Sequence, residues 1–531
     1  MRSIKRWAKV SAVLAAAALA LSACGGGSAD KKAGGSTGTK ASGELKVFAA
    51  YDTTNWNPSN TSSALAVGAN LQVVEGLYEF DFSKFKAHKA LAAEDAPTKV
   101  NDPTYEVTLR DGAKFSTGDA VSSKDVVSSY KRIVDGDKDS TGAVQPSSYA
   151  AFLTAISGIE AKDDSTVTIK LTHAIDNLKE RLALIKVVPS KATFDELTKM
   201  PVGSGPYKYD TITDTTQDLS VNEHYNGANP ATVSKIHYDN SRDATARLTA
   251  AVAGQTDVVE ALDPAGIEKV KAAGWEVKDA TAYGIAMMTF NTTKAPFKDK
   301  RVRQALLTAI DTQTMIKTAL NGAGKEPTSF LPDYNDQYKK AATQFSFDVA
   351  KAKKLLADAG VAAGTEISVL TTTDTWIAAM GPQIKQNFEA LGLKVNLNNV
   401  ASADLWNNNV AQGKFDVVVA PGDASVYGAD PGVLIKGWFF SELWMKDRFR
   451  LTESDPAGAK ALVDLMDKAD KATGDEAKAK WGEVQDMIAD QAALYPLAFH
   501  TLYTAYNPAK VSNLTPLGVT GLQLIGTKVS N

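Results

Sequence analysis

The stretch LRDGAKFSTGDAV, from Leu109 to Val121, lies between a strand-like pattern and a helical pattern. Before it, residues 105–109 (YEVTL) alternate as in a half-buried strand. After it, Ser122 and Asp125 have the spacing of a capping box. Apolar residues then recur on one helical face, at Val126, Tyr130 and Ile133. This part of the chain therefore predicts a strand, a glycine-containing loop and a helix.

The same alternation of strand and helix patterns continues on both sides of this stretch. Short strands are predicted at residues 45–48 (LKVF) and 166–171 (TVTIKL). One helix is predicted at residues 299–310 and a second one after Asp311, which would cap it. A third helix is predicted from about Asp348 to Gly360, with an acid at its start and glycine after its end. The sequence therefore predicts a mixed α/β protein.

The N-terminus has the pattern of an export signal. Residues 1–23 begin with basic side chains and continue into a short uncharged run, which indicates a signal peptide. Cys24, the only cysteine, follows Leu21-Ser22-Ala23 and looks like the lipidated residue of a bacterial lipobox. Residues 24–43 are rich in glycine, serine and lysine, as in a flexible tether. We expect a lipid anchor at Cys24, and a free thiol is the alternative.

Charge and length limit the possible functions. Removing residues 1–23 takes away four of the 58 basic residues and none of the 61 acidic ones, which leaves a net charge of −7. This balance argues against a nucleic-acid partner. The chain is longer than the ~250–300 residues at which one hydrophobic core stops growing, so two or three domains are expected.

The residues offer no recognisable catalytic or metal centre. The five histidines are scattered, and no HExxH or phosphate-binding loop is present. We therefore expect no enzyme activity, no metal and no cofactor. On residue chemistry alone, the sequence indicates an exported, tethered, non-enzymatic protein.

The order of several motifs is more specific. Residues 109–121 are followed by PVGSGPYKYD (201–210), FNTTKAPFKDKRVRQALLTAID (290–311), LLADAG (355–360) and DQAALYPLAFH (490–500). In this order they resemble the peptide-binding family, family 5, of the solute-binding lipoproteins that serve ABC importers. The glycines of Gly203-Ser204-Gly205 permit a positive φ, as a sharp crossing between lobes would need.

The resemblance implies an α/β fold with two lobes, as in periplasmic binding proteins, and a ligand cleft between them. The first lobe would comprise residues 44–80, 205–285 and 505–531. An inserted domain would span 81–204, and the second lobe would span 286–504. The lobes would close around the ligand by a hinge motion.

The resemblance also implies the ligand-binding residues. The acidic residue that pairs with the α-ammonium of a peptide is matched by Asp423 in VAPGD. A buried ammonium needs a counter-charge. The alternative is that Asp423 only caps a turn.

Aromatic and polar residues complete the predicted site. In GWFFSELW, Trp438 and Phe440 stand where family members line the cleft, and Trp406 is a further candidate. Aromatic clusters of this kind also form cores. The remaining candidates are Ser62 and Ser63, from the loop at 59–64, and His500, which could donate to a ligand carbonyl or lie in the core.

These observations imply a lipid-anchored, extracytoplasmic receptor that captures peptides and delivers them to an ABC permease. We expect a monomer, held at the cell membrane through Cys24. The same fold with an oligosaccharide or another small solute as ligand is the alternative. An exported hydrolase is the least supported possibility, because no nucleophile and base can be paired from the sequence.

Overall fold

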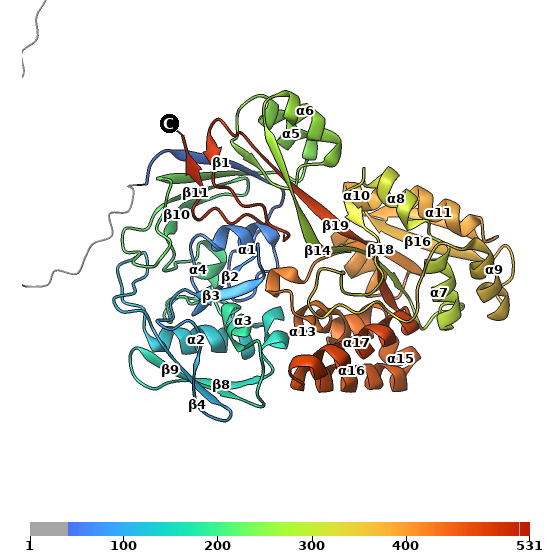
Figure 1. Cartoon of the computed structure of the whole chain (residues 1–531), viewed down its shortest axis with the longest axis horizontal. Helices are drawn as coiled ribbons and strands as arrows, with labels where there is room; N and C mark the ends of the chain where they lie inside the picture. Colours follow the sequence, from blue (N-terminus) through green and yellow to red (C-terminus); the bar gives the residue numbers. More distant parts are fainter. Residues whose placement is uncertain (1–40, 520, 531) are drawn as a thin grey trace, which may run out of the picture. The chain divides into compact units, whose positions relative to one another are not determined.

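The computed structural model describes residues 41–519 and 521–530. The chain from Lys40 to Asn531 forms one compact unit. The predicted signal peptide, Cys24 and nearly all of the predicted tether lie outside the described residues. The described part is mixed α/β and has two lobes, as predicted (Figure 1). We keep the predicted ranges as names for its parts: first lobe, inserted domain and second lobe.

One sheet of 11 strands runs through both lobes. Its order is β10-β11-β12-β1-β13-β19-β14-β18-β16-β17, and β15 also pairs with β19. The strands at the first-lobe end are β1 (Glu44–Ala49), β10 (Tyr207–Ile212), β11 (Thr216–Val221), β12 (Lys235–Asn240) and β13 (Val258–Val259). Those at the second-lobe end are β15 (Gly324–Lys325), β16 (Glu366–Thr372), β17 (Lys394–Val400) and β18 (Val417–Gly422).

Two long antiparallel strands connect the lobes. They are β14 (Glu276–Phe290) and β19 (Leu494–Tyr506), and Figure 1 shows them side by side between the two ends of the sheet. Their pairing has a register break between Thr281 and Ile285, and a second shift between Ala286 and Met287. Such irregularities bend a strand locally. The break therefore gives β14 a different course where it leaves the first lobe.

The first lobe has its own hydrophobic core. Leu45, Val47 and Ile236 are fully buried in it, on strands β1 and β12, which are parallel neighbours. Helices cover this part of the sheet: α1 (Ala64–Asn70), α5 (Ala244–Val252) and α6 (Ile267–Ala272). The C-terminal segment adds the short pair β20 (Val511–Ser512) and β21 (Lys528–Val529).

The inserted domain is built on a second sheet, in the order β4-β5-β9-β8. The strand β2 (Tyr78–Asp81) stands where the first lobe passes into this domain, and it pairs with β3 (Lys86–Lys89). The other elements of the domain are β4 (Thr98–Asn101), β5 (Thr104–Thr108), α2 (Ser123–Val134), β6 (Asp137–Lys138), β7 (Val144–Gln145), β8 (Ile156–Ala161), β9 (Thr166–Leu171), α3 (Leu178–Ala183) and α4 (Phe194–Lys199). The helix predicted after Ser122 is confirmed as α2, and its capping box with Asp125 is formed. The strand predicted at 166–171 is β9.

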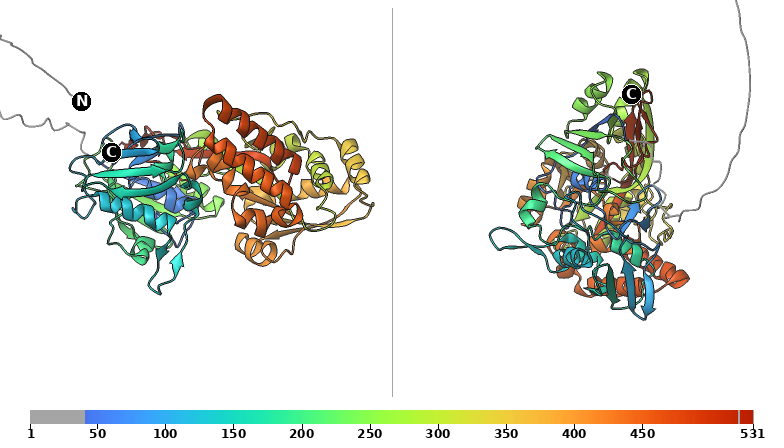
Figure 2. Two further views of the ribbon diagram at one scale, coloured as in Figure 1. Left: turned by 90° about the horizontal axis from the view of Figure 1, so that it is seen from below. Right: turned by 90° about the vertical axis from the view of Figure 1, so that its left-hand side faces the viewer.

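The second lobe is mainly helical around the parallel strands β16, β17 and β18. Its longer helices are α7 (Lys300–Thr308), α8 (Thr312–Ala319), α9 (Val349–Asp358), α11 (Gly381–Glu389), α16 (Pro456–Lys471) and α17 (Gly474–Gln491). Short helices are α10 (Thr375–Ala378), α12 (Ser402–Asp404), α13 (Pro431–Leu434), α14 (Lys436–Phe439) and α15 (Leu451–Ser454). α16 and α17 lie side by side (Figure 2). The predicted caps Asp311 and Asp348 each accept a backbone N–H.

The prediction that Gly203 and Gly205 supply a positive φ is wrong. Neither has one. A Cβ on Gly203 would lie 2.1 Å from the carbonyl oxygen of Val73, and one on Gly205 would lie 2.8 Å from the same atom. The N–H of Gly205 donates to this oxygen at 2.8 Å. These glycines are therefore required because the chain returns from the inserted domain in direct contact with the backbone of the first lobe.

Candidate functional site: a cavity between the lobes

A cavity of about 870 Å³ lies between the first and second lobes. The register break of β14 borders it, through Ala282, Gly284 and Ile285. Its other walls come from residues 50–64, 242–247, 261–264, 373–376, 421–427 and 500–503. Its volume is in the ~300–1,000 Å³ range of sites for small molecules. The cavity therefore has the size and the position of the predicted cleft.

Asp423 lines this cavity directly after the end of β18. Its carboxylate accepts hydrogen bonds from the backbone N–H of Ser425 at 2.8 Å and from its hydroxyl at 2.6 Å. It packs against Gly284, where a Cβ would lie 3.6 Å from Asp423 Oδ2. Asp423 thus caps a turn and also faces the cavity, so the two interpretations of the sequence are compatible.

The surroundings of Asp423 disfavour its negative charge. Burial raises the pKa of Asp423 from 3.8 to about 6, although the hydrogen bonds from Ser425 act in the opposite direction. No cationic side chain pairs with Asp423 among residues 41–519 and 521–530. A positively charged group of a ligand would supply the missing partner.

His500 and Trp376 form a stacked pair in the wall of the cavity. Their ring centroids are 4.2 Å apart and the ring planes differ by 8°. Burial lowers the pKa of His500 to about 4, so the imidazole is neutral at pH 7. Trp376 stands on α10, just after the end of the parallel strand β16.

Ser62 and Ser63 line the first-lobe side of the cavity. The hydroxyl of Ser63 donates to the carbonyl oxygen of Asp52 at 3.2 Å, and its N–H donates to Thr61 Oγ1. Ser62 is exposed. The predicted serines, His500 and Asp423 are therefore brought together around one cavity.

The predicted aromatic residues lie elsewhere. Trp438 is 8% exposed and packs beneath Gly422, where a Cβ would lie 2.6 Å from its ring. Trp406 packs edge-on against Trp444, and Phe440 lies 4.9 Å from the ammonium group of Lys436. Trp406, Trp438 and Phe440 are absent from the lining of the large cavity, because they are packed among aromatic and basic side chains of the second lobe. Trp438 supports the Asp423 loop from below.

Sequence reasoning did not identify most of the cavity lining, including Tyr51, Arg247 and Trp376. The signal for Trp376 would have been its place just after the strand β16, which was not predicted, since ligands bind at the carboxyl ends of parallel strands. Arg247 was not recognisable, because it is 6% exposed within an ordinary helix. Burial and the nearby carboxylate of Glu260 raise the pKa of Tyr51 well above its ordinary value.

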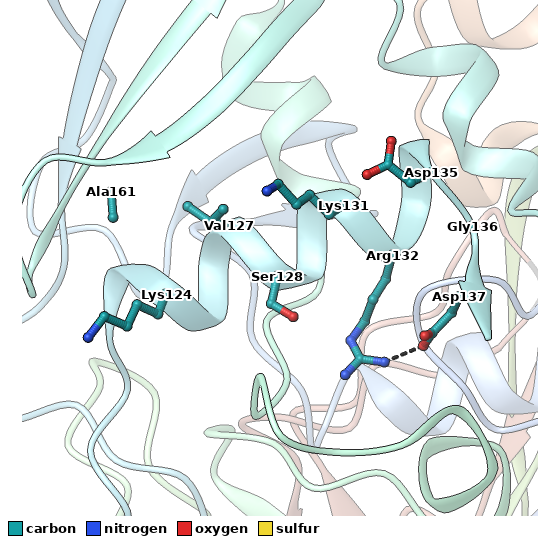
Figure 3. Close-up of a pocket in the computed structure, with 9 residues that line it drawn as sticks. All are labelled: Lys124, Val127, Ser128, Lys131, Arg132, Asp135, Gly136, Asp137 and Ala161. Carbon is teal, nitrogen blue, oxygen red and sulfur yellow. Dashed lines mark hydrogen bonds and ion pairs between the residues drawn. The ribbon is translucent and has the colours of Figure 1, made fainter. Parts of the chain in front are cut away.

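A surface hollow of about 440 Å³ on α2 lies in the inserted domain, apart from the cavity between the lobes (Figure 3). Arg132 forms an ion pair with Asp137 there, and Figure 3 shows Lys124 and Lys131 at separate places along the helix. Since these groups do not converge on one point, this hollow is a poor candidate for a solute site.

Within the described residues, no three or more histidine, cysteine or acidic side chains are grouped so that they could hold a metal ion. No helix in this part of the chain is long and apolar enough to cross a membrane.

Residues 86–442 match the family described as bacterial extracellular solute-binding proteins, family 5 Middle, which is more than half of the chain. The chain belongs to this family. The predicted family and the predicted role as a binding protein rather than an enzyme are thereby confirmed. A family of extracellular proteins also agrees with the predicted export.

The names of proteins related to this family 5 chain refer to different ligands. Heme-binding protein A of Haemophilus influenzae is 28% identical over 398 residues, which cover 70% of this chain and 71% of the relative. Di/tripeptide-binding protein 3 of Pseudomonas aeruginosa is 23% identical over 476 residues, 81% of this chain and 84% of the relative. Both cover most of the family 5 chain.

Solved structures support the two-lobe fold. The ABC transporter-associated periplasmic binding protein DppA from Helicobacter pylori, in complex with the peptide STSA, superposes with a TM-score of 0.79. It is 21% identical, and the match covers 92% of this chain and 99% of that one.

Proposed function

We propose that this family 5 protein is the peptide receptor of an ABC importer, and that it holds peptides in the cavity between its lobes. The observation that carries the proposal is Asp423, a carboxylate that lines the cavity without a cationic partner among the described residues. An α-ammonium group would pair with this carboxylate and compensate for the hydration that the carboxylate loses on burial.

The neighbouring groups suit a peptide in other ways. Neutral His500 can donate to or accept from a peptide group, while Ser62 and Ser63 offer hydroxyls on the opposite wall. The relative named as a di/tripeptide-binding protein supports the same class of ligand. The solved relative that holds the peptide STSA supports it as well.

The receptor would act at the outer face of the cell membrane as a monomer. Cys24 would carry the lipid, and the segment at 24–43 would let the lobes reach the permease. Replacing Cys24 by alanine tests this anchor. We expect the wild-type chain to incorporate radiolabelled palmitate and to fractionate with membranes, and Cys24→Ala to do neither. Labelling of Cys24→Ala would contradict the proposal.

Mass spectrometry of co-purified solutes tests the ligand. The chain from Gly25 to Asn531 keeps every residue that the structure describes, and denaturation would release whatever it holds. Peptides in the released fraction, and their loss in Asp423→Ala, are the expected result. Peptides that bind Asp423→Ala as tightly as wild type, regardless of N-acetylation, would exclude this role of Asp423.

A different small solute, such as an oligosaccharide, is the second candidate. The stacked pair of Trp376 and His500 favours it, because sugars bind against aromatic faces. The relative named as a heme-binding protein indicates that ligands vary among proteins similar to this one. A single non-peptide compound in the mass spectrum would leave the receptor role in place and replace the ligand.

A further inference from the structure

More acidic than basic side chains line the cavity. The lining carries four carboxylates, on Asp52, Asp263, Asp374 and Asp423, and two guanidinium groups, on Arg242 and Arg247. His500 adds no charge at pH 7, because burial keeps it neutral. The balance available to a solute depends on which of these groups are already paired within the protein.

Both guanidinium groups are engaged. Arg242 lies 2.6 Å from a carboxylate oxygen of Asp52, in an exposed ion pair. Arg247 donates to the carbonyl oxygens of Ser241 at 2.7 Å and Ala261 at 3.0 Å. Its Nε is enclosed by protein, without a partner in the described part of the chain.

Arg247 also has a protein counter-charge behind the cavity. Glu260 is 5% exposed and does not line the cavity. The two side chains attract each other, and Glu260 is further held by the backbone N–H groups of Ala50 and Gly521. The positive charge of Arg247 is therefore compensated before a solute arrives.

Three carboxylates remain without an ion-pair partner among the described residues: Asp263, Asp374 and Asp423. Asp263 accepts a hydrogen bond from the N–H of Ala265 at 2.9 Å. Asp374 stands at the N-cap of α10, but its side chain accepts no capping hydrogen bond from a backbone N–H. Its negative charge acts on Arg242 and Tyr51 of the first lobe, so it faces the cavity from the opposite side.

We propose that the cavity selects peptides with a net positive charge, in which Asp374 pairs with a basic side chain while Asp423 holds the α-ammonium. This inference rests on the proposed function. Trp376, two residues after Asp374, lines the same cavity and offers an apolar surface to the methylene stem of lysine or arginine. An acidic side chain would enter a cavity that already has excess negative charge and would be rejected.

Isothermal titration of residues 25–531 with Ala-Ala-Ala and its single lysine and glutamate variants tests the inference. With lysine and glutamate placed in turn at each of the three positions, the best lysine peptide should bind at least about tenfold more tightly than the matching glutamate peptide. That ratio corresponds to about 1.4 kcal/mol. The preference should shrink as salt rises from about 0.05 to about 0.5 M, since salt screens such attraction.

Asp374→Asn should remove most of the preference for lysine over alanine at the preferred position. Glu453→Gln is the matched control: it changes the net charge equally, and Glu453 is exposed in the second lobe outside the cavity. Equal binding of lysine and glutamate peptides, or an unchanged lysine preference in Asp374→Asn, overturns the inference alone. Failure of every peptide to bind overturns the proposed function with it.

Discussion

Arg181 of the inserted domain and Asp430 of the second lobe form a two-point ion pair. Nη2 of Arg181 lies 2.7 Å from Oδ1 of Asp430, and Nη1 lies 3.2 Å from Oδ2. The arginine side chain is 5% exposed and the carboxylate 22%. Gly432 leaves room for the guanidinium, because a Cβ there would lie 2.6 Å from Nη2. This pair connects α3 to the start of α13.

Other contacts accompany this ion pair. Phe85 of the inserted domain packs edge-on against Tyr283 of β14, with ring centroids 4.9 Å apart, and Tyr283 packs against Tyr334 of the second lobe at 5.2 Å. On another part of the same interface, the rings of Tyr149 and Tyr427 are 5.0 Å apart. The inserted domain and the second lobe are therefore held together by apolar and charged contacts.

Removing one member of the pair should loosen this interface. Arg181→Ala leaves Asp430 partly buried without its cation, so we expect a loss of about 2–4 kcal/mol in the free energy of unfolding. Urea denaturation measures it. We also expect a larger radius of gyration in small-angle X-ray scattering, because the lobes would separate more often.

A double variant distinguishes the ion pair from general packing. Arg181→Met with Asp430→Leu removes both charges, and should recover much of the stability lost in Arg181→Ala. If Arg181→Ala unfolds like the wild type, the pair contributes nothing to the interface.

The raised pKa of Asp423 predicts opposite effects on stability and on binding. Because the folded state holds the Asp423 proton more tightly than the unfolded chain does, the Asp423 contribution to stability is lost as pH rises from about 4 to about 6. Asp423→Asn keeps the acceptor for Ser425 without the charge. At pH 7 this variant should be more stable than the wild type by about 1 kcal/mol, after allowance for partial exposure.

The same substitution should weaken peptide binding at least about tenfold, the scale of a lost charge-assisted contact. In the wild type, peptide affinity should fall as pH drops below about 6, since protonated Asp423 no longer attracts an ammonium group. Urea denaturation and titration calorimetry between pH 5 and 8 would measure both effects. A variant that is destabilised at pH 7 and binds normally would contradict this account.

His500 should respond to pH in the other direction. Its folded-state pKa of about 4 is below the usual 6.5, so stability rises with pH between about 4 and 6.5. His500→Phe keeps an aromatic ring against Trp376 and should remove this component of the pH profile. His500→Ala should cost about 2–4 kcal/mol through the lost stacking and the space left behind. Equal stability of the two variants would show that the stacking does not matter.

The sequence was sufficient for features determined by local patterns. The capping box at Ser122 and the caps at Asp311 and Asp348 were recognisable in single segments. The resemblance to family 5 rested on the order of five short motifs, each of which is also local. Asp423 was predicted because its motif stands in one short loop, and the structure places it in the cavity.

Features that depend on distant residues were not recognisable. The sequence left open whether the aromatic residues of GWFFSELW line the cleft or form a core, and in the structure the ring of Trp438 packs against Gly422 of β18 and against Trp444. Similarly, Arg247 and Glu260 meet only because α5 and β13 fold against the same part of the first lobe. Periodicity and composition carry no information on such pairs.

Gly203 and Gly158 provide a matched pair for testing the close contact at Val73. A methyl group on Gly203 would lie 2.1 Å from the Val73 carbonyl oxygen and 2.7 Å from its neighbour Val74 Cα, so the backbone of the first lobe would have to move. Gly158, on β8, has no positive φ, and no atom lies within 4 Å of the point that its Cβ would occupy. Both substitutions add one methyl group, but only the first meets backbone.

We expect Gly203→Ala to lower the free energy of unfolding by at least about 3 kcal/mol, or to prevent folding, as overpacking against backbone cannot relax by a rotamer change. Gly158→Ala should change it by less than about 1 kcal/mol, because the reduced freedom of the unfolded chain offsets any local cost. Urea denaturation of both variants, or their yield of folded protein where Gly203→Ala fails to refold, measures the difference. Equal stability of the two alanine variants would mean that the backbone at Gly203 can move away from Val73 at little cost. The contact with Val73 would then not require glycine at positions 203 and 205.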